Sequence, residues 1–270
     1  MIQKIYDIYT SICLSVLKMI DPYKKSIGRP NKYDYNFYIK HIINVTVNGL
    51  SWNKLGLLLT MKTDLIRKKY NKWSKLNLFT KTNNIILNQY KKNNKIDSFF
   101  IDSTNIVNFS GHLDFGYNIK NKNKKSIKIS VLVDHNKIPH LIDISKGSVH
   151  DAKIMETIIS NKLRYNKKIF NLVGDKGYIK NEQYIDTIKK SNNITLITPL
   201  RINSKNKNII STEIKTLLSE RHKVEHFFSL LKRGFKRISI INDKILTNYN
   251  GFLNIAVSLI SLKTIFTKIT

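Results

Sequence analysis

The first third of the chain carries apolar residues at spacings of three and four, the period of a helix that buries one face. From Met1 to Lys92 this spacing is interrupted mainly at Gly28, Pro30 and Gly49. We therefore predict a helical N-terminal region over residues 1–95, built from several short helices.

We expect three of these helices over 38–47, 52–59 and 63–73, with a turn at Asn48 and Gly49 between the first two. Such an arrangement can place a basic helix against the backbone of DNA. The third helix would carry the required side chains, which are Arg67, Lys68, Lys69 and Lys72. The alternative is a bundle that only packs on the rest of the protein through Trp52, Leu58 and Trp73.

Beyond the polar run 91–95 the pattern changes to short segments typical of strands, followed by an alternation of helices and strands. Such an alternation predicts an α/β domain over residues 96–270, with a sheet that carries helices on its faces. The expected strands are 98–102, 117–119, 126–133, 138–144, 169–173 and 194–198. The expected helices are 152–160, 182–190, a long helix over 214–232 and a final helix over 246–269, with an exposed loop at 205–210.

Composition adds a strong positive charge to this picture. Lys and Arg number 47 against 18 Asp and Glu, a formal net charge of +29, which favours a polyanionic partner and above all nucleic acid. The single Cys13 excludes an internal disulfide framework and a multi-cysteine zinc site, and it suits an intracellular, reducing compartment. Lys263 interrupts the apolar C-terminal run, so we expect no membrane span.

Three acidic residues stand where a shared site can form. Asp102 and Asp175 each follow an apolar strand-like segment, and two strands of one sheet can bring such residues together. Glu225 lies on the expected long helix, with Arg221 four residues before it and Lys232 seven residues after it, on one helical face.

Carboxylates in this arrangement suit phosphodiester cleavage with two Mg²⁺ ions, because hard divalent cations prefer oxygen ligands. Asp102, Asp175 and Glu225 would hold the metal ions, with Mn²⁺ as a substitute for Mg²⁺. Arg221 and Lys232 would add positive charge for the DNA backbone beside them.

The motifs around these residues resemble those of DDE transposases encoded by insertion sequences, especially the branch numbered five. The similarity rests on Asp-x-Gly-Tyr at Asp175 and on Arg-x3-Glu-x6-Lys from Arg221 to Lys232, with Ile101-Asp102-Ser103-Thr104 similar to the first acidic motif. It extends over about residues 28–262. Where the family often has a Tyr three residues before the Arg, Leu218 stands here, which puts the handling of DNA ends in doubt more than metal binding.

The resemblance implies an RNase H-like catalytic domain with the third acid on a late helix. It also implies a transposase that acts on the terminal inverted repeats of a mobile element and on target double-stranded DNA. Joining two ends implies a homodimer in a synaptic complex. Two alternatives stay open: a transposase-derived nuclease that cuts without joining, and a basic DNA-binding protein without activity.

Simpler structural roles compete for some of these residues. A lone Asp after a strand often caps a turn, and Asp134 and Asp143 fit that role. For His150 and Asp151 we favour a helix N-cap, with the Asp151 carboxylate accepting from the first amides of the helix, over a fourth metal ligand.

Overall fold

The computed structural model describes residues 1–22, 33–108, 116–118, 124–162, 170–200 and 211–269. The chain divides into two compact units that do not follow a single cut in the sequence. The first unit contains residues 1–93, 107–114 and 230–270, and the second contains residues 94–106 and 115–229. Residues 230–270 therefore belong with the N-terminal helices, although they follow the second unit in sequence.

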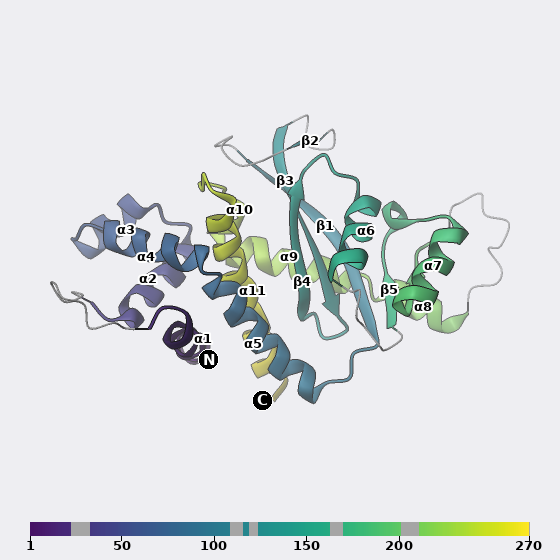
Figure 1. The fold of residues 1–270 in the computed structure, drawn as a ribbon, viewed down its shortest axis with the longest axis horizontal. Helices are drawn as coiled ribbons and strands as arrows, with labels where there is room; N and C mark the ends of the chain where they lie inside the picture. Colours follow the sequence, from purple (N-terminus) through teal and green to yellow (C-terminus); the bar gives the residue numbers. More distant parts are fainter. Residues whose placement is uncertain (23–32, 109–115, 119–123, 163–169, 201–210, 270) are drawn as a thin grey trace. The chain divides into compact units, whose positions relative to one another are not determined.

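Helices build the first unit, as the apolar spacing predicts (Figure 1). Two of them begin at side chains that accept a hydrogen bond from the first turn: Asp34 accepts from the Phe37 N–H, and Ser51 accepts from the Lys54 N–H. Gly28 and Pro30 lie outside the described residues. The helices of the N-terminal segment are α1 (Ile2–Ile20), α2 (Tyr35–Asn48), α3 (Trp52–Leu59), α4 (Asp64–Lys75) and α5 (Leu78–Asn93).

Helix α11 (Leu246–Ile269) forms the core of this unit and matches the final helix predicted for the chain. Its residues 251–262 are all buried, and it packs against α1, α4 and α5. A helix that is apolar on every side belongs in a core or in a membrane. By length and composition α11 could cross a membrane, but 67% of its apolar window is buried inside the structure.

A buried ion pair lies within the C-terminal segment, and its arginine also bonds the loop between α2 and α3. Short helix α10 (Lys236–Ser239), which the sequence pattern does not predict, supplies Arg237. Its guanidinium bonds both carboxylate oxygens of Asp243, at 2.9 and 3.2 Å, and donates to the Leu50 carbonyl. Gly49 ends α2 with φ +67°, and a Cβ at this position would lie 2.8 Å from the Lys236 Cβ. Only a glycine fits both conditions.

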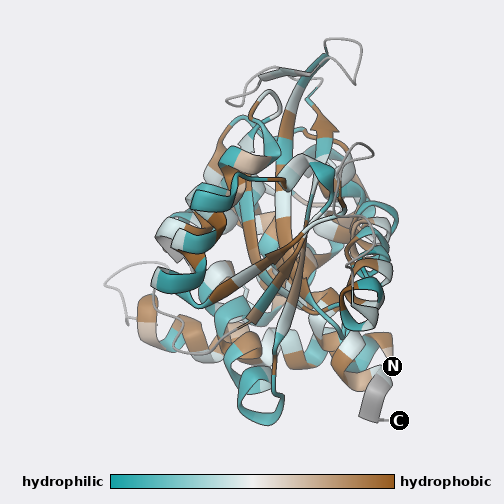
Figure 2. Cartoon of the chain, turned by 90° about the vertical axis from the view of Figure 1, so that its right-hand side faces the viewer, coloured by the Kyte–Doolittle hydropathy of each residue, from teal (hydrophilic) through white to brown (hydrophobic). Residues whose placement is uncertain are grey.

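The second unit is built on a mixed sheet, with strand order β2-β3-β1-β5-β6 and β4 beside β3. β1 pairs with β5 and β5 with β6 in parallel, whereas β3 and β4 are antiparallel. Figure 2 shows the apolar residues concentrated on these strands. The strands confirm those predicted, and they are β1 (Ser98–Val107), β2 (Gly116–Asn118), β3 (Lys124–Asp134), β4 (Pro139–Lys146), β5 (Phe170–Val173) and β6 (Ile194–Ile197).

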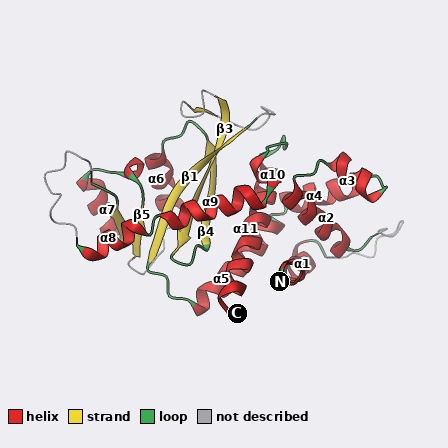
Figure 3. Ribbon diagram, turned by 180° about the vertical axis from the view of Figure 1, so that it is seen from behind, coloured by secondary structure: helices red, strands yellow, loops and turns green. Residues whose placement is uncertain are grey.

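Helices cover both faces of this sheet. Phe99 and Ile101 of β1 join a buried cluster with α6 (Asp151–Lys162) and with Ile188 of α7 (Glu182–Asn192). Phe100 points the other way, because side chains alternate along a strand. On that face the Lys223 ammonium of α9 (His222–Gly234) lies 5.6 Å from the Phe100 ring centre. Figures 1 and 3 agree, since α6 and α9 lie on opposite sides of β1. The α/β prediction is confirmed.

The single long helix predicted over 214–232 is wrong, because the chain forms α8 (Thr212–Ser219) and then α9. Side chains hydrogen-bond the last carbonyls of α8. The Ser219 hydroxyl donates to the Thr216 carbonyl at 2.7 Å, and His222 Nδ1 lies 2.9 Å from the Ser219 carbonyl. Such local bonds compete with continuation of the helix. The break places Arg221 just before α9 and Glu225 in its first turn.

Candidate active site

The pairing of β1 with β5 brings the first two predicted acids to one end of the sheet. The last paired residues are Phe100 and Val173, and Asp102 and Asp175 each lie two positions beyond them. Because the two strands are parallel, both acids follow the same end of the pair. Asp102 does not end its strand as predicted, since β1 continues to Val107. The acids thus lie where the two strands separate.

Asp102 is a partly buried carboxylate with other acids around it. Its pKa is raised from 3.8 to about 6, chiefly by burial and also by the carboxylates of Asp175 and Asp151, against the lowering effect of the Ser103 N–H bond and the Arg221 guanidinium. The Ser103 N–H donates to Asp102 Oδ1 at 2.8 Å. The site therefore places negative charge in a poorly solvated position, which an added cation would relieve.

Asp175 begins the short 3-10 turn η2 (Lys176–Tyr178), and its side chain accepts from the Gly177 N–H at 2.8 Å. A Cβ on Gly177 would lie 3.0 Å from Asp175 Oδ1 and 3.6 Å from Asp151 Oδ2. Two carboxylates from different segments therefore lie against one glycine. Capping of the turn, the simpler role for such an Asp, is compatible with a place in this site.

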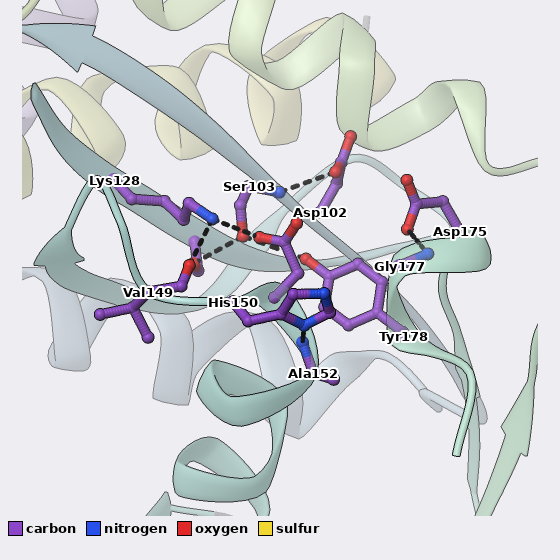
Figure 4. Close-up of polar contacts among 11 residues, drawn as sticks. Asp102, Ser103, Lys128, Val149, His150, Ala152, Asp175, Gly177 and Tyr178 are labelled. Carbon is purple, nitrogen blue, oxygen red and sulfur yellow. Dashed lines mark hydrogen bonds and ion pairs between the residues drawn. The ribbon is translucent and has the colours of Figure 1, made fainter. Parts of the chain in front are cut away.

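A chain of buried hydroxyl groups connects the strands below the acids. Tyr178 is fully buried, its hydroxyl lies 3.0 Å from the Ser103 hydroxyl, and Ser103 lies 2.7 Å from the Ser130 hydroxyl of β3. The chain ties the turn after β5 to the residue beside Asp102 (Figure 4). It therefore positions both acid-bearing segments, a role that the sequence pattern alone does not indicate.

Glu225, the third predicted acid, is paired with Arg221, which directly precedes α9. Arg221 Nη2 lies 2.9 Å from Glu225 Oε1, and the Glu225 side chain is 55% exposed. Among the described residues, no three acidic, histidine or cysteine side chains are close enough to hold one metal ion. The structure thus brings Asp102 and Asp175 together but leaves Glu225 bound to Arg221. Lys232 lies in the last turn of α9, and burial lowers its pKa.

The N-cap predicted at His150 and Asp151 is formed differently. The ring nitrogen Nδ1 of His150 accepts from the Ala152 N–H at 3.3 Å, so the imidazole caps α6. Asp151 does not accept from these amides, because its carboxylate lies 2.8 Å from the ammonium of Lys128 on β3. Lys128 stands out in the sequence as a charge within the apolar segment 126–133, but it was not among the predicted site residues.

Asp134 has the structural role predicted for it. It is fully buried, its Oδ1 accepts from the amides of Asn136 and Ile138, and its Oδ2 lies 3.0 Å from His140 Nε2. These bonds shape the turn between β3 and β4.

The basic side chains predicted to bind DNA in the first unit lie on α4. Arg67 pairs with Asp64 at 3.1 Å, Lys72 pairs with Asp21 at 2.7 Å, and Lys68 is exposed. The alternative of packing alone is partly contradicted, because Leu58 is 67% exposed, although Trp73 is buried. The Arg67–Asp64 pair is exposed on both sides, and exposed ion pairs of this kind are weak.

Comparison with known proteins gives one family. The family model described as "Transposase DDE domain" matches residues 93–257. No curated protein matches the sequence.

Three solved structures are similar at 13% sequence identity. The cryo-EM structure of a piggyBac transposase synaptic complex with hairpin DNA has a TM-score of 0.47, with 97% of this chain and 66% of that chain covered. This chain therefore spans less than two thirds of that protein's length. The Mos1 strand transfer complex has a TM-score of 0.29, covering 79% and 82% of the two chains. The structure of a pre-cleavage Mos1 transpososome has a TM-score of 0.25, with 92% of this chain and 82% of that chain covered.

Proposed function

Because this chain belongs to the family of transposases with a DDE domain, we propose that it cuts and joins DNA at the ends of a mobile element, with Asp102, Asp175 and Glu225 as its catalytic acids. The observation that carries the proposal is the register of β1 and β5, in which both aspartates follow the last pair of parallel residues. They lie within the segment that matches the family. Membership of the branch numbered five remains a prediction.

The donor set suits Mg²⁺ or Mn²⁺. Asp102 loses solvation on burial and feels the charges of two other carboxylates, so a divalent cation would lower the cost of keeping all three ionised. Asp102, Asp175 and Glu225 would hold two such ions. When bound there, the cations would supply Lewis-acid activation of the attacking oxygen and stabilisation of the leaving oxygen.

Glu225 can reach such a role at a small cost. Its pair with Arg221 is exposed, and pairs of this kind contribute only about 0–1 kcal/mol. Release of the pair would free the Glu225 carboxylate for a cation and the Arg221 guanidinium for a phosphate oxygen. Arg221, just before α9, and Lys232, in its last turn, would then bind the DNA backbone.

The remaining partners are double-stranded DNA at the terminal inverted repeats and at the target. Arg67, Lys68 and Lys72 on α4 would contact one of these duplexes, in agreement with the formal charge of +29. Hydrolysis would leave a 3′-hydroxyl at the element end. This hydroxyl would then attack a target phosphodiester and displace its 3′ oxygen. Pairing two ends requires a homodimer. The protein would act inside the cell, where the DNA is.

The test is cleavage and strand transfer on labelled DNA that carries the element's ends, in Mg²⁺ or Mn²⁺. Asp175→Ala should abolish nicking and joining, whereas Asp186→Asn, which removes an exposed acid of α7, should leave both unchanged. Equal activity in wild type and Asp175→Ala would refute the assignment. Cleavage without joining would indicate a nuclease, and salt-sensitive DNA binding without cleavage would indicate a binding protein.

A further inference from the structure

A buried lysine reaches from the sheet to the edge of the candidate site. Lys128 lies on β3 between Ile127 and Ile129, and its side chain is only 8% exposed. Its ammonium donates to the Val149 carbonyl at 2.6 Å and to Asp151 Oδ1 at 2.8 Å. Figure 4 shows the Lys128 side chain extending toward Val149, with a dashed line from its ammonium to the Val149 carbonyl oxygen.

These contacts hold the Asp151 carboxylate in one orientation. A buried ammonium loses its hydration, so it needs hydrogen-bond acceptors and an opposite charge. The backbone carbonyl and the carboxylate supply both. Because β3 fixes one end of this contact and the N-terminus of α6 fixes the other, the carboxylate has little freedom to turn.

The second oxygen of this carboxylate lies near Gly177, the glycine that also adjoins the Asp175 carboxylate. Asp151 Oδ2 and Asp175 Oδ1 lie 3.6 and 3.0 Å from the position that a Cβ on Gly177 would occupy. A glycine therefore leaves open the space that both carboxylates adjoin. The charge of Asp151 also reaches Asp102, since it contributes to the raised pKa of that residue. The charges of Asp151 and Asp175 therefore both act on Asp102.

We propose that Asp151 is a further acidic residue of the cation site and that Lys128 positions it. The inference rests on the function proposed above. Asp151 would act through its charge and through cation-bound water, since no three such side chains among the described residues are close enough to bind one ion directly.

The test is the affinity of the purified full chain for Mn²⁺, measured by calorimetry, with the Mn²⁺ concentration for half-maximal nicking as a second readout. Asp151→Asn should weaken binding by about 10–100-fold, as the loss of outer partners of a metal site does. The matched control is Asp186→Asn, which removes the same charge from an exposed position and should bind as wild type does.

The variant Lys128→Met tests whether Lys128 orients the Asp151 carboxylate or only neutralises its charge. If the ammonium only neutralised Asp151, its removal would make the site more negative and tighten Mn²⁺ binding. If it positions Asp151, Lys128→Met should weaken binding although the site becomes more negative. Tighter binding would overturn the positioning role.

A second variant keeps the test valid if Asp151→Asn fails to fold with an unpaired buried ammonium. The double variant Lys128→Met with Asp151→Asn removes both charges, and it should bind Mn²⁺ about 10–100-fold more weakly than wild type. Binding like wild type in the folded variants would overturn the inference alone, provided Asp175→Ala has lost binding. A wild type that neither binds Mn²⁺ nor nicks DNA would overturn the proposed function as well.

Discussion

Asp102→Asn should make the cation-free protein more stable near neutral pH. Burial and the neighbouring carboxylates raise the Asp102 pKa from 3.8 to about 6, so ionised Asp102 disfavours the folded state. The difference corresponds to about 3 kcal/mol in the free energy of unfolding, at 1.36 kcal/mol for each pKa unit. Asparagine removes the charge and keeps an oxygen that can accept from the Ser103 N–H.

The stability gained by Asp102→Asn should increase with pH. A carboxyl group with a raised folded-state pKa stabilises the fold below its unfolded pKa, and this stabilisation is lost as pH rises through the folded pKa. The advantage of Asp102→Asn should therefore approach about 3 kcal/mol at about pH 7.5 and fall to about half of that at about pH 5. Below about pH 4 it should nearly vanish, because the wild-type carboxyl group is then protonated in both states.

The assay is urea unfolding of wild type and Asp102→Asn in a chelator, at several pH values. Asp186→Asn serves as the control, because it removes an exposed carboxylate and should show no comparable pH-dependent gain. A variant that is less stable than wild type at about pH 7.5, or a difference that stays constant with pH, would refute the reasoning. The same variant should lose nicking activity, since the charge that costs stability is the one required for the cation.

Three further changes test the structure around the site and in the helical unit. Tyr178→Phe removes the buried hydroxyl next to Ser103, and it should lower the free energy of unfolding by about 1 kcal/mol in urea titration; no change would contradict the hydroxyl chain. Arg237→Met leaves Asp243 buried without its cation, and it should cost about 3–5 kcal/mol, largely restored when Asp243→Leu is added. Gly49→Ala should lower the melting temperature measured by circular dichroism, because it places a Cβ at a positive φ and 2.8 Å from the Lys236 Cβ. An unchanged melting temperature would show that α10 can shift away from the new Cβ without cost.

Local signals were sufficient for most elements. The spacing of apolar residues predicted the helices of residues 1–93 and the final helix, because a helix that buries one face must repeat its apolar residues every three to four positions. The strands followed from short apolar runs between turns. The long helix over 214–232 failed because its break comes from side chains that bond the carbonyls of α8, with neither glycine nor proline to mark it.

For the candidate site too, some features follow from the sequence and others only from the tertiary structure. The sequence by itself determined which acids are candidates, since Asp102, Asp175 and Glu225 stand in motifs with fixed spacing, and it determined that their partner should be a polyanion. Only the tertiary structure decided that the first two acids follow one pair of parallel strands, because strand pairing joins residues far apart in the chain. It also decided that Asp151 turns to Lys128 instead of capping its helix. A contact between β3 and α6 depends on how the sheet and helix pack, so the sequence marks Lys128 as an unusual residue in a strand but does not identify Asp151 as its partner.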